Sequence, residues 1–355
     1  MKKNTITLAL LALLTFLAPA ACAADQTART PTPAEIGAGL RKLQPAADAA
    51  IKHDLIIIDE GLNNLLRVNE RAPSASWCVA LDVEKPRDLQ LIGGGRLLVG
   101  FENGYLEYNL ADGKLLKKFA SLKGVTSARR QPDGSTLIAC ADLGGKKGIY
   151  TLTLDANDKI TGAPAAFPLQ HDKDNFVRLI RQTEQGTYLM PCQDELREGA
   201  PDGRYLKKYP VEGFHNMWKA VRLPNKHIIA SSGYGAFMVE LDETGAIVRK
   251  WGGKDQVPAG VNPYFAATFQ LLANGHVVLA NWQGHGTNNG SKGVQIIEYD
   301  RDGKIVWQWS PANRAALISS LQGVLVLDGL DLARLHDERA GVMAPVETCT
   351  KNATP

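Results

Sequence analysis

The sequence predicts an all-β protein that folds as a single β-propeller of about six four-stranded blades. Three observations support this prediction. A strand–turn–strand pattern recurs along the chain, its turn residues at positions 95, 134, 186, 226 and 275 stand 39 to 52 residues apart, and the two ends of the chain complement each other. Short strands that repeat at such intervals are typical of propeller blades.

Each repeat begins with two apolar strands around a tight turn. The copies span residues 89–100, 128–139, 179–190, 220–230 and 269–280. We expect one residue of each turn to adopt a positive φ, as tight hairpins require. A second hairpin follows most copies, for example at 105–116, 238–248 and 296–307, with the alternation of half-buried strands. Two hairpins give four antiparallel strands per blade.

The two ends of the repeat pattern supply one further blade. Residues 319–328 read as an innermost strand without the three that should follow it, whereas 54–59, 64–69 and 77–81 read as three strands without a first. Pairing of the strand at 319–327 with that at 54–58 would leave no open sheet edge. Five continuous blades and this shared one give six. Seven is the alternative if a wider gap holds another unit.

The N-terminus has the features of an export signal. Lys2 and Lys3 precede the apolar stretch 6–18, and Ala21-Cys22-Ala23 fits a cleavage site. We expect residues 1–23 to be a signal peptide and the protein to be periplasmic or secreted, with a lipid anchor on Cys22 or an uncleaved anchor as alternatives. The remaining chain divides into a linker with a short helix (24–50, the helix near 33–43), the propeller (51–331) and a C-terminal tail (332–355). No later segment is long and apolar enough to span a membrane.

Composition is that of a globular protein, with 45% hydrophobic and 22% charged residues. A net charge of +3 gives no polybasic surface for nucleic acid. Cleavage after residue 23 would leave Cys78, Cys140, Cys192 and Cys349, which allow three disulfide pairings. None lies in a C-x-x-C cluster, so we expect no metal or redox site, and Cys140 and Cys192 are interpreted as small buried residues.

Candidate site residues gather where a propeller places its loops. The innermost strand of each blade starts, and the second strand ends, at the same mouth of the central channel. The segment 281–292 is the richest in polar and aromatic side chains. The residues that we expect to bind a ligand at this mouth are Trp282, His285, His215, Trp218, Asn281, Gln193 and Glu102.

These residue types suit a small polar ligand such as a carbohydrate, because aromatic rings pack on its C–H faces while amides and carboxylates bind its hydroxyls. The alternative to ligand binding is that Trp282 only packs between blades and that His215 only forms hydrogen bonds that support the structure. No catalytic residue can be assigned, because the sequence has no nucleophile elbow, zinc-binding helix, phosphate loop or dinucleotide fingerprint in a suitable context. An enzyme acting on carbohydrates at the same mouth and a scaffold for protein partners remain alternative functions.

Residues 302–309 resemble the tryptophan-containing blade motif of quinoprotein-like propellers, which are also called the pyrroloquinoline-quinone-binding-like group. Further copies of the motif occur at residues 242–251 and 112–119. The resemblance covers about residues 51–331. It implies a propeller whose tryptophans dock one blade against the next, as in exported bacterial members without assigned activity. The quinone-dependent enzymes of the group have eight blades and two adjacent cysteines beside the cofactor. This chain has no adjacent cysteines, so we expect no cofactor.

The chain also resembles arylsulfate sulfotransferases, which use a catalytic histidine. This resemblance adds a sulfotransferase-like enzyme as an alternative function and implies the role of catalytic histidine for His215 or His285.

Overall fold

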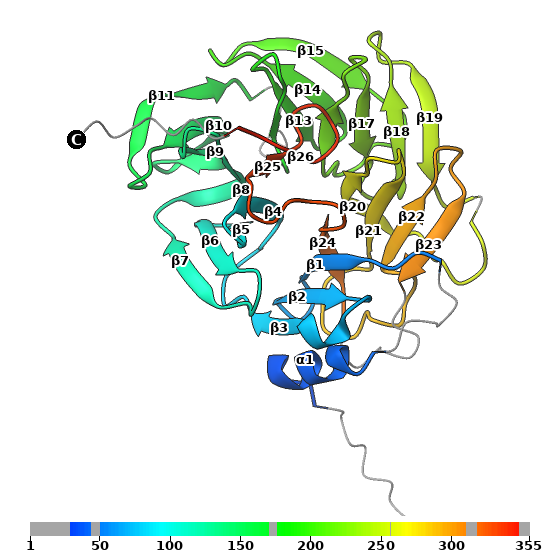
Figure 1. Cartoon of the computed structure of the whole chain (residues 1–355). Helices are drawn as coiled ribbons and strands as arrows, with labels where there is room; N and C mark the ends of the chain where they lie inside the picture. Colours follow the sequence, from blue (N-terminus) through cyan, green and yellow to red (C-terminus); the bar gives the residue numbers. More distant parts are fainter. Residues whose placement is uncertain (1–28, 44–49, 170–175, 256, 310–317, 348–355) are drawn as a thin grey trace, which may run out of the picture. The chain divides into compact units, whose positions relative to one another are not determined.

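The computed structural model describes residues 29–43, 50–169, 176–255, 257–309 and 318–347. The expected signal peptide, Cys22 and Cys349 lie outside these residues. Six four-stranded antiparallel sheets are arranged in a ring, which confirms the six-bladed propeller and not the seven-bladed alternative (Figure 1).

The blades are numbered along the chain, and their strands run from the centre outward. Blade 1 has the order β24 (Leu321–Val326), β1 (Asp54–Asp59), β2 (Asn64–Asn69), β3 (Trp77–Ala80), with the short helix η1 (Pro73–Ala75) before β3. Blade 2 holds β4 (Asp88–Gly93), β5 (Arg96–Phe101), β6 (Gly104–Asn109) and β7 (Leu115–Phe119). Blade 3 holds β8 (Lys123–Arg130), β9 (Thr136–Leu143), β10 (Lys146–Leu154) and β11 (Ile160–Phe167).

The second half of the ring repeats the pattern. Blade 4 holds β12 (Arg181–Gln182), β13 (Tyr188–Cys192), β14 (Glu195–Gly199) and β15 (Tyr205–Pro210). Blade 5 holds β16 (Ala220–Arg222), β17 (Ile228–Ser231), β18 (Phe237–Leu241) and β19 (Ile247–Gly252). Blade 6 holds β20 (Phe265–Leu271), β21 (Val277–Trp282), β22 (Ile296–Tyr299) and β23 (Ile305–Trp309).

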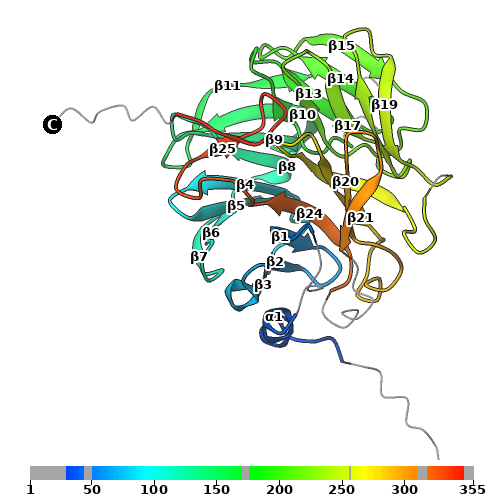
Figure 2. The ribbon, with the colours of Figure 1, turned by 45° about the vertical axis from the view of Figure 1, so that its right-hand side comes forward.

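Blade 1 combines strands from far apart in the chain. The predicted pairing is present: β24 runs antiparallel to β1, with Leu55 opposite Val326 and Ile57 opposite Val324. Figure 2 shows the orange-red β24 beside the blue β1. Buried Asp59 strengthens this junction, because its carboxylate accepts hydrogen bonds from the backbone N–H groups of Ser319 at 2.7 Å and Ser320 at 3.0 Å.

The predicted hairpin turns have the expected backbone. All five turn residues adopt a positive φ between 64° and 84°, and one of them, Lys226, is not a glycine. Asn225 assists at that turn by accepting a hydrogen bond from the backbone N–H of His227 through its side chain. The turns therefore set the register of each inner hairpin.

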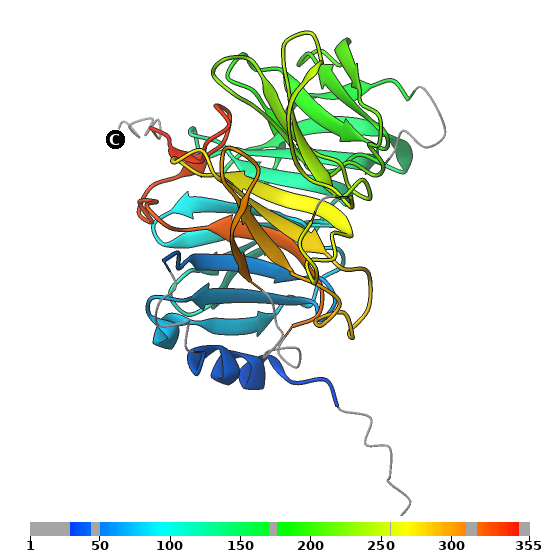
Figure 3. The same ribbon diagram turned by 90° about the vertical axis from the view of Figure 1, so that its right-hand side faces the viewer.

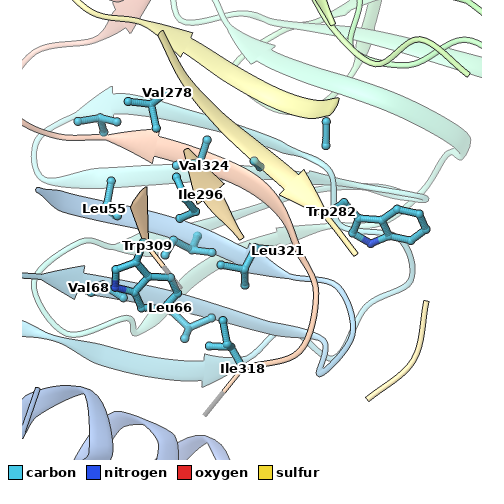
Figure 4. Close-up of a cluster of buried hydrophobic side chains, with 14 of the residues drawn as sticks. Leu55, Leu66, Val68, Val278, Trp282, Ile296, Trp309, Ile318, Leu321 and Val324 are labelled. Carbon is cyan, nitrogen blue, oxygen red and sulfur yellow. The ribbon is translucent and has the colours of Figure 1, made fainter. Parts of the chain in front are cut away.

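The apolar core is divided among the blades. Six apolar clusters among the described residues each lie between two neighbouring blades. Figure 4 shows side chains of the cluster between blades 6 and 1, which includes Trp309. Trp251 packs between blades 5 and 6 and donates its indole N–H to the carbonyl of Asp300. Both tryptophans therefore pack between neighbouring blades.

The expected short helix is α1 (Pro33–Arg41), capped by Thr32 and Glu35. It buries Ile36 and Leu40 against the outer strand of blade 1 (Figure 1). No helix within the described ranges is long and apolar enough to span a membrane.

The cysteines of the described residues are buried. Cys78 and Cys140 are free thiols, and burial raises their pKa values to about 12 and about 11, respectively. Cys192 is also buried, as expected.

Residues 328–347, here called the C-terminal segment, cross one end of the central channel (Figures 1 and 3). The segment includes the short pair β25 (His336–Asp337) and β26 (Ala344–Pro345). It contacts the inner strands at the ends opposite the mouth, where Leu335 bridges to Ile92 and Val342 to Leu271. The sequence showed no strand pattern after residue 332, because the two strands of this segment are only two residues long and the alternation of a strand cannot be recognised over two residues.

The C-terminal segment inserts Glu338 among cations inside the channel. Glu338 is 4% exposed and forms ion pairs with Lys219 at 2.5 Å and with Arg181, while Arg129 lies 3.9 Å away. Asp88 pairs with the same Arg181 at 2.6 Å. Burial alone would raise the pKa of Glu338, but the charges of Lys219, Arg181 and Arg129 hold it well below its usual range.

A second buried ion cluster joins blades 1 and 6. The His53 ring contacts Asp328 through Nδ1 at 2.5 Å and Glu298 through Nε2 at 2.8 Å. Burial alone would lower the pKa of His53, but the hydrogen bonds to Asp328 and Glu298 and the charges of these carboxylates raise it to about 9. His53 is therefore protonated at neutral pH and acts as the cation of this cluster.

The raised pKa makes part of the stability pH-dependent. A rise from 6.5 in the unfolded chain to about 9 corresponds to about 3 kcal/mol. This contribution is complete below pH 6.5 and is lost as the pH rises through 9. We expect His53→Gln to lower the free energy of unfolding by about 3 kcal/mol at pH 6.5 and by much less at pH 9.5. Urea unfolding of both proteins across this range measures the gap, and a gap that does not shrink would contradict the assignment.

Candidate functional site

A cavity of about 240 Å³ opens at the mouth of the channel, at the end opposite the C-terminal segment. We call it the mouth pocket. Its lining comes from the starts of inner strands and the ends of second strands, as the fold predicts. The lining consists of five aromatic side chains, three cations and four other polar residues: Phe176, Trp218, Tyr234, Phe265 and Trp282; Lys85, Arg87 and Arg178; Glu60, Asn216, His285 and Gln322.

One wall of the mouth pocket is aromatic. Phe265 is its centre, with ring centroids 4.8 Å from Tyr234, 5.3 Å from Trp282 and 5.6 Å from Trp218, all edge to face. Such pairs add about 0.5–1.5 kcal/mol each beyond the area they bury. The Trp218 indole N–H is also fixed, by Thr268 at 3.2 Å. These contacts fix the position of each ring in the wall.

Trp282 both packs and lines the pocket. Its side chain is only 4% exposed and belongs to the cluster between blades 6 and 1. Figure 4 shows it at the end of its strand, apart from Leu55, Val68 and Trp309. Its indole N–H donates to Glu60 Oε2 at 3.1 Å. The two interpretations of Trp282 from the sequence, pocket contact and packing between blades, therefore both describe its position.

Glu60 joins Trp282 to His285 at the rim. Its other oxygen, Oε1, lies 2.8 Å from Nδ1 of His285, whose ring packs edge-on against Trp282 at 4.6 Å. The His285 side chain is 77% exposed. Glu60 thereby fixes the orientation of an accessible imidazole, an arrangement that can transfer a proton to or from a bound molecule.

Another part of the lining, here called the cationic wall, carries the positive charge of Lys85, Arg87 and Arg178. Arg87 is buried and lies 3.5 Å from Glu102, which is also 3.4 Å from Lys85. Arg178 stacks on the Phe176 ring at 3.4 Å and lies 5.6 Å from the Trp218 ring. It forms no ion pair with a carboxylate among the described residues. Burial, reinforced by the charge of Arg87, lowers the pKa of Arg178 to about 9.

Three buried polar atoms of the lining lack a hydrogen-bond partner within the described part of the chain. They are Arg178 Nε, Asn216 Oδ1 and Gln322 Oε1. Buried polar atoms are almost always paired, with protein or with another molecule, because leaving one unpaired costs about 1–3 kcal/mol. The mouth pocket is therefore a largely aromatic cavity, and three of its polar lining residues each have one buried polar atom that the described part of the protein does not pair.

The structure brings together three of the residues expected to bind a ligand: Trp282, His285 and Trp218. Glu102 lines the adjoining cavity, which shares Lys85, Arg87 and Arg178 with the mouth pocket. Whether any of these residues contacts a ligand stays a prediction.

The other three expected residues lie outside the lining. His215 is exposed and packs against Tyr234 at 5.4 Å, so it is separated from the pocket by one side chain. Asn281 is buried and holds the loop by accepting from the Tyr264 backbone N–H and donating to the Val294 carbonyl. The Gln193 backbone pairs with Phe176 and Met217, next to the pocket wall. All three support the mouth without facing its cavity.

Two arginines of the lining were not among the residues expected from the sequence. Arg87 immediately precedes β4 and Arg178 lies three residues before β12, so both are at starts of inner strands. That position was the available signal, because residues there reach the mouth. Aromatic and amide side chains were expected to form the site at these positions, whereas cations were not.

Comparison with known proteins gives the fold and no more. No protein-family model matches the chain, and no curated protein matches it. A protein of unknown function from Bacteroides caccae has a solved structure similar to this one, with a TM-score of 0.63, 23% identity, and coverage of 78% of this chain and 99% of that one. A streptogramin B lyase structure matches with a TM-score of 0.50, 12% identity, and coverage of 78% and 97%. The likeness shows a shared propeller fold alone. The resemblance to quinoprotein-like propellers stays a prediction.

Proposed function

We propose that this propeller binds a small polar ligand with an apolar face in the mouth pocket. The observation that carries the proposal is the lining of one cavity, in which five aromatic side chains meet the polar side chains of Arg178, Asn216 and Gln322. Concave sites that combine a largely apolar lining with a few converging polar groups are the usual form of ligand pockets.

The size of the mouth pocket limits the ligand. At about 240 Å³ it is below the roughly 300–1,000 Å³ of pockets for drug-sized molecules. It suits a molecule built on one ring, such as a monosaccharide or a single aromatic ring. Either would place an apolar ring face on the wall formed by Trp218, Phe265 and Trp282. Export directed by residues 1–23 would place this activity in the periplasm or outside the cell.

The proposal predicts a specific role for one tryptophan. Trp282→Phe keeps an aromatic ring but removes the donor to Glu60 and part of the wall. We expect this change to weaken binding of a monosaccharide or single-ring ligand about tenfold, equivalent to about 1.4 kcal/mol. Isothermal titration calorimetry with the mature protein measures the change, with ligands first selected by thermal shift from neutral and acidic sugars and single-ring aromatics.

Trp251→Phe is the matched control. Trp251 is equally buried and also donates its indole N–H to a neighbouring blade, but it does not line the pocket. Both variants should lose a similar amount of stability, about 1–3 kcal/mol, and only Trp282→Phe should lose affinity. An equal loss of affinity in the two variants, or no ligand found in the panel, would refute the proposed function.

A further inference from the structure

Resting on the proposed function, we infer that the ligand of the mouth pocket is a small organic anion: one ring that carries a carboxylate, held at Arg87 and Arg178 with its ring on the aromatic wall. The inference depends on the distribution of charge around the cavity and on the state of each charged group there.

The charges around the mouth pocket are unequal. The pocket itself is lined by the cations Lys85, Arg87 and Arg178 and by one carboxylate, Glu60. The adjoining cavity adds the carboxylates Glu84, Glu102 and Asp142 and the cations Lys123 and Lys147. Both oxygens of Glu60 are already used by Trp282 and His285 on the aromatic side. Glu102 is shared between Lys85 and Arg87 at 3.4 and 3.5 Å, distances longer than a direct charge-assisted hydrogen bond. The pocket therefore keeps an excess positive charge on its cationic wall.

Arg178 is the centre of this excess. Its guanidinium donates from Nη1 to the carbonyl of Val177 at 3.0 Å, but Nε is buried and has no partner among the described residues. Phe176 covers one face of the guanidinium. Arg178 thus lines the pocket without a carboxylate partner among the described residues, and guanidinium groups are the side chains best suited to bind a carboxylate ligand.

The electrostatics agree with this geometry. Burial lowers the pKa of Arg178 to about 9 and also lowers the pKa of Arg87, and each guanidinium carries a desolvation cost that the nearby carboxylates do not fully offset. An anion at these two side chains would offset that cost. A neutral sugar would leave it in place, so the pocket should discriminate by charge more strongly than by ring type.

The test uses matched pairs that differ chiefly in charge. Glucuronate against glucose forms the sugar arm, and benzoate against benzyl alcohol forms the aromatic arm. We expect the acid of at least one pair to bind the mature protein tenfold or more tightly than its neutral partner, because a hydrogen bond to a charged group contributes about 1.5–3 kcal/mol. The arm that shows the preference identifies the ring.

Arg178→Gln should reduce that preference to less than threefold, because the loss of its charge weakens binding of the acid more than binding of the neutral partner. Arg249→Gln is the control, because Arg249 also stacks near a tryptophan, 5.5 Å from the Trp251 ring, but lies outside the pocket. If Arg178→Gln does not fold, Lys85→Gln serves instead, since the Lys85 side chain is 57% exposed; there a loss of about threefold in acid binding is expected.

The outcomes separate this inference from the proposed function. If neutral members bind as tightly as acids and Trp282→Phe weakens them, the ligand pocket stands and the anion inference is wrong. The anion inference is also wrong if Arg178→Gln keeps the full preference for acids or, where that variant does not fold, if Lys85→Gln does not weaken binding of the acid. If no member of either pair binds, the anion inference fails, and the proposed function fails with it when no other member of the ligand panel binds.

Discussion

A chain that ends at residue 311 is expected to lose cooperative folding. It lacks β24, whose six residues are all buried, including Leu321, Val324, Leu325 and Val326. Losing four buried side chains of this size removes about 1.5–3 kcal/mol each, which together approaches the whole stability of about 5–15 kcal/mol of a typical domain. It also leaves the inner edge of β1 without a partner. Circular dichroism during heating should show a broad, shallow change.

A chain that ends at residue 329 is the control. It keeps β24 and the contact of Asp328 with His53 but lacks most of the C-terminal segment. We expect it to melt cooperatively at a lower temperature than the full chain. A sharp transition from the chain that ends at residue 311 would show that β24 is dispensable and that blade 1 is stable with three strands.

Glu338→Gln is expected to destabilise the protein by about 3–5 kcal/mol, the usual cost of removing one partner from a buried ion pair. The change leaves Lys219, Arg181 and Arg129 inside the channel with Asp88 as the carboxylate that still pairs with the two arginines. Glutamine has nearly the same shape, so the loss reports charge and not packing. Chemical denaturation at pH 7 gives the difference in the free energy of unfolding.

Glu347→Gln is the matched control on the same segment. Glu347 pairs with Arg334, but its side chain is 93% exposed, so water screens the interaction and the substitution should be silent. If Glu338→Gln is equally silent, the ion cluster does not hold the C-terminal segment in the channel.

The number and order of the blades could be predicted because they depend on local signals. Each inner hairpin consists of apolar strands around a turn residue, and the turn at Lys226 has the positive φ expected of it although it lacks a glycine. The partnership of β24 with β1 followed from the missing strands at the two ends. The C-terminal segment could not be predicted as ordered, because Glu338 has its partners on blades 3 and 4 and next to blade 5, and no periodicity reveals such contacts.

The candidate site could be predicted only in part, because some of its features follow from strand order and others depend on contacts in space. Trp282, His285 and Trp218 were found because strand order alone places them at the mouth. The state of Arg178 depends on what surrounds it in space: Phe176 on its face, Arg87 nearby and no carboxylate of the described residues in contact. The sequence contains all of these residues but not their distances, so charge balance in the pocket became visible only in the structure.

The sharing of blade 1 between distant strands has a consequence for the order of events during synthesis. The strand β1 is among the first parts of the propeller to be made, yet its partner β24 ends only at Val326. Contacts that join such distant segments slow folding, and an unfinished sheet edge is open to wrong partners while it waits. Blades 2 to 6 each come from one continuous stretch and can form in turn. We therefore expect the last step of folding to be the docking of β24, with intermediates sensitive to aggregation until that strand arrives.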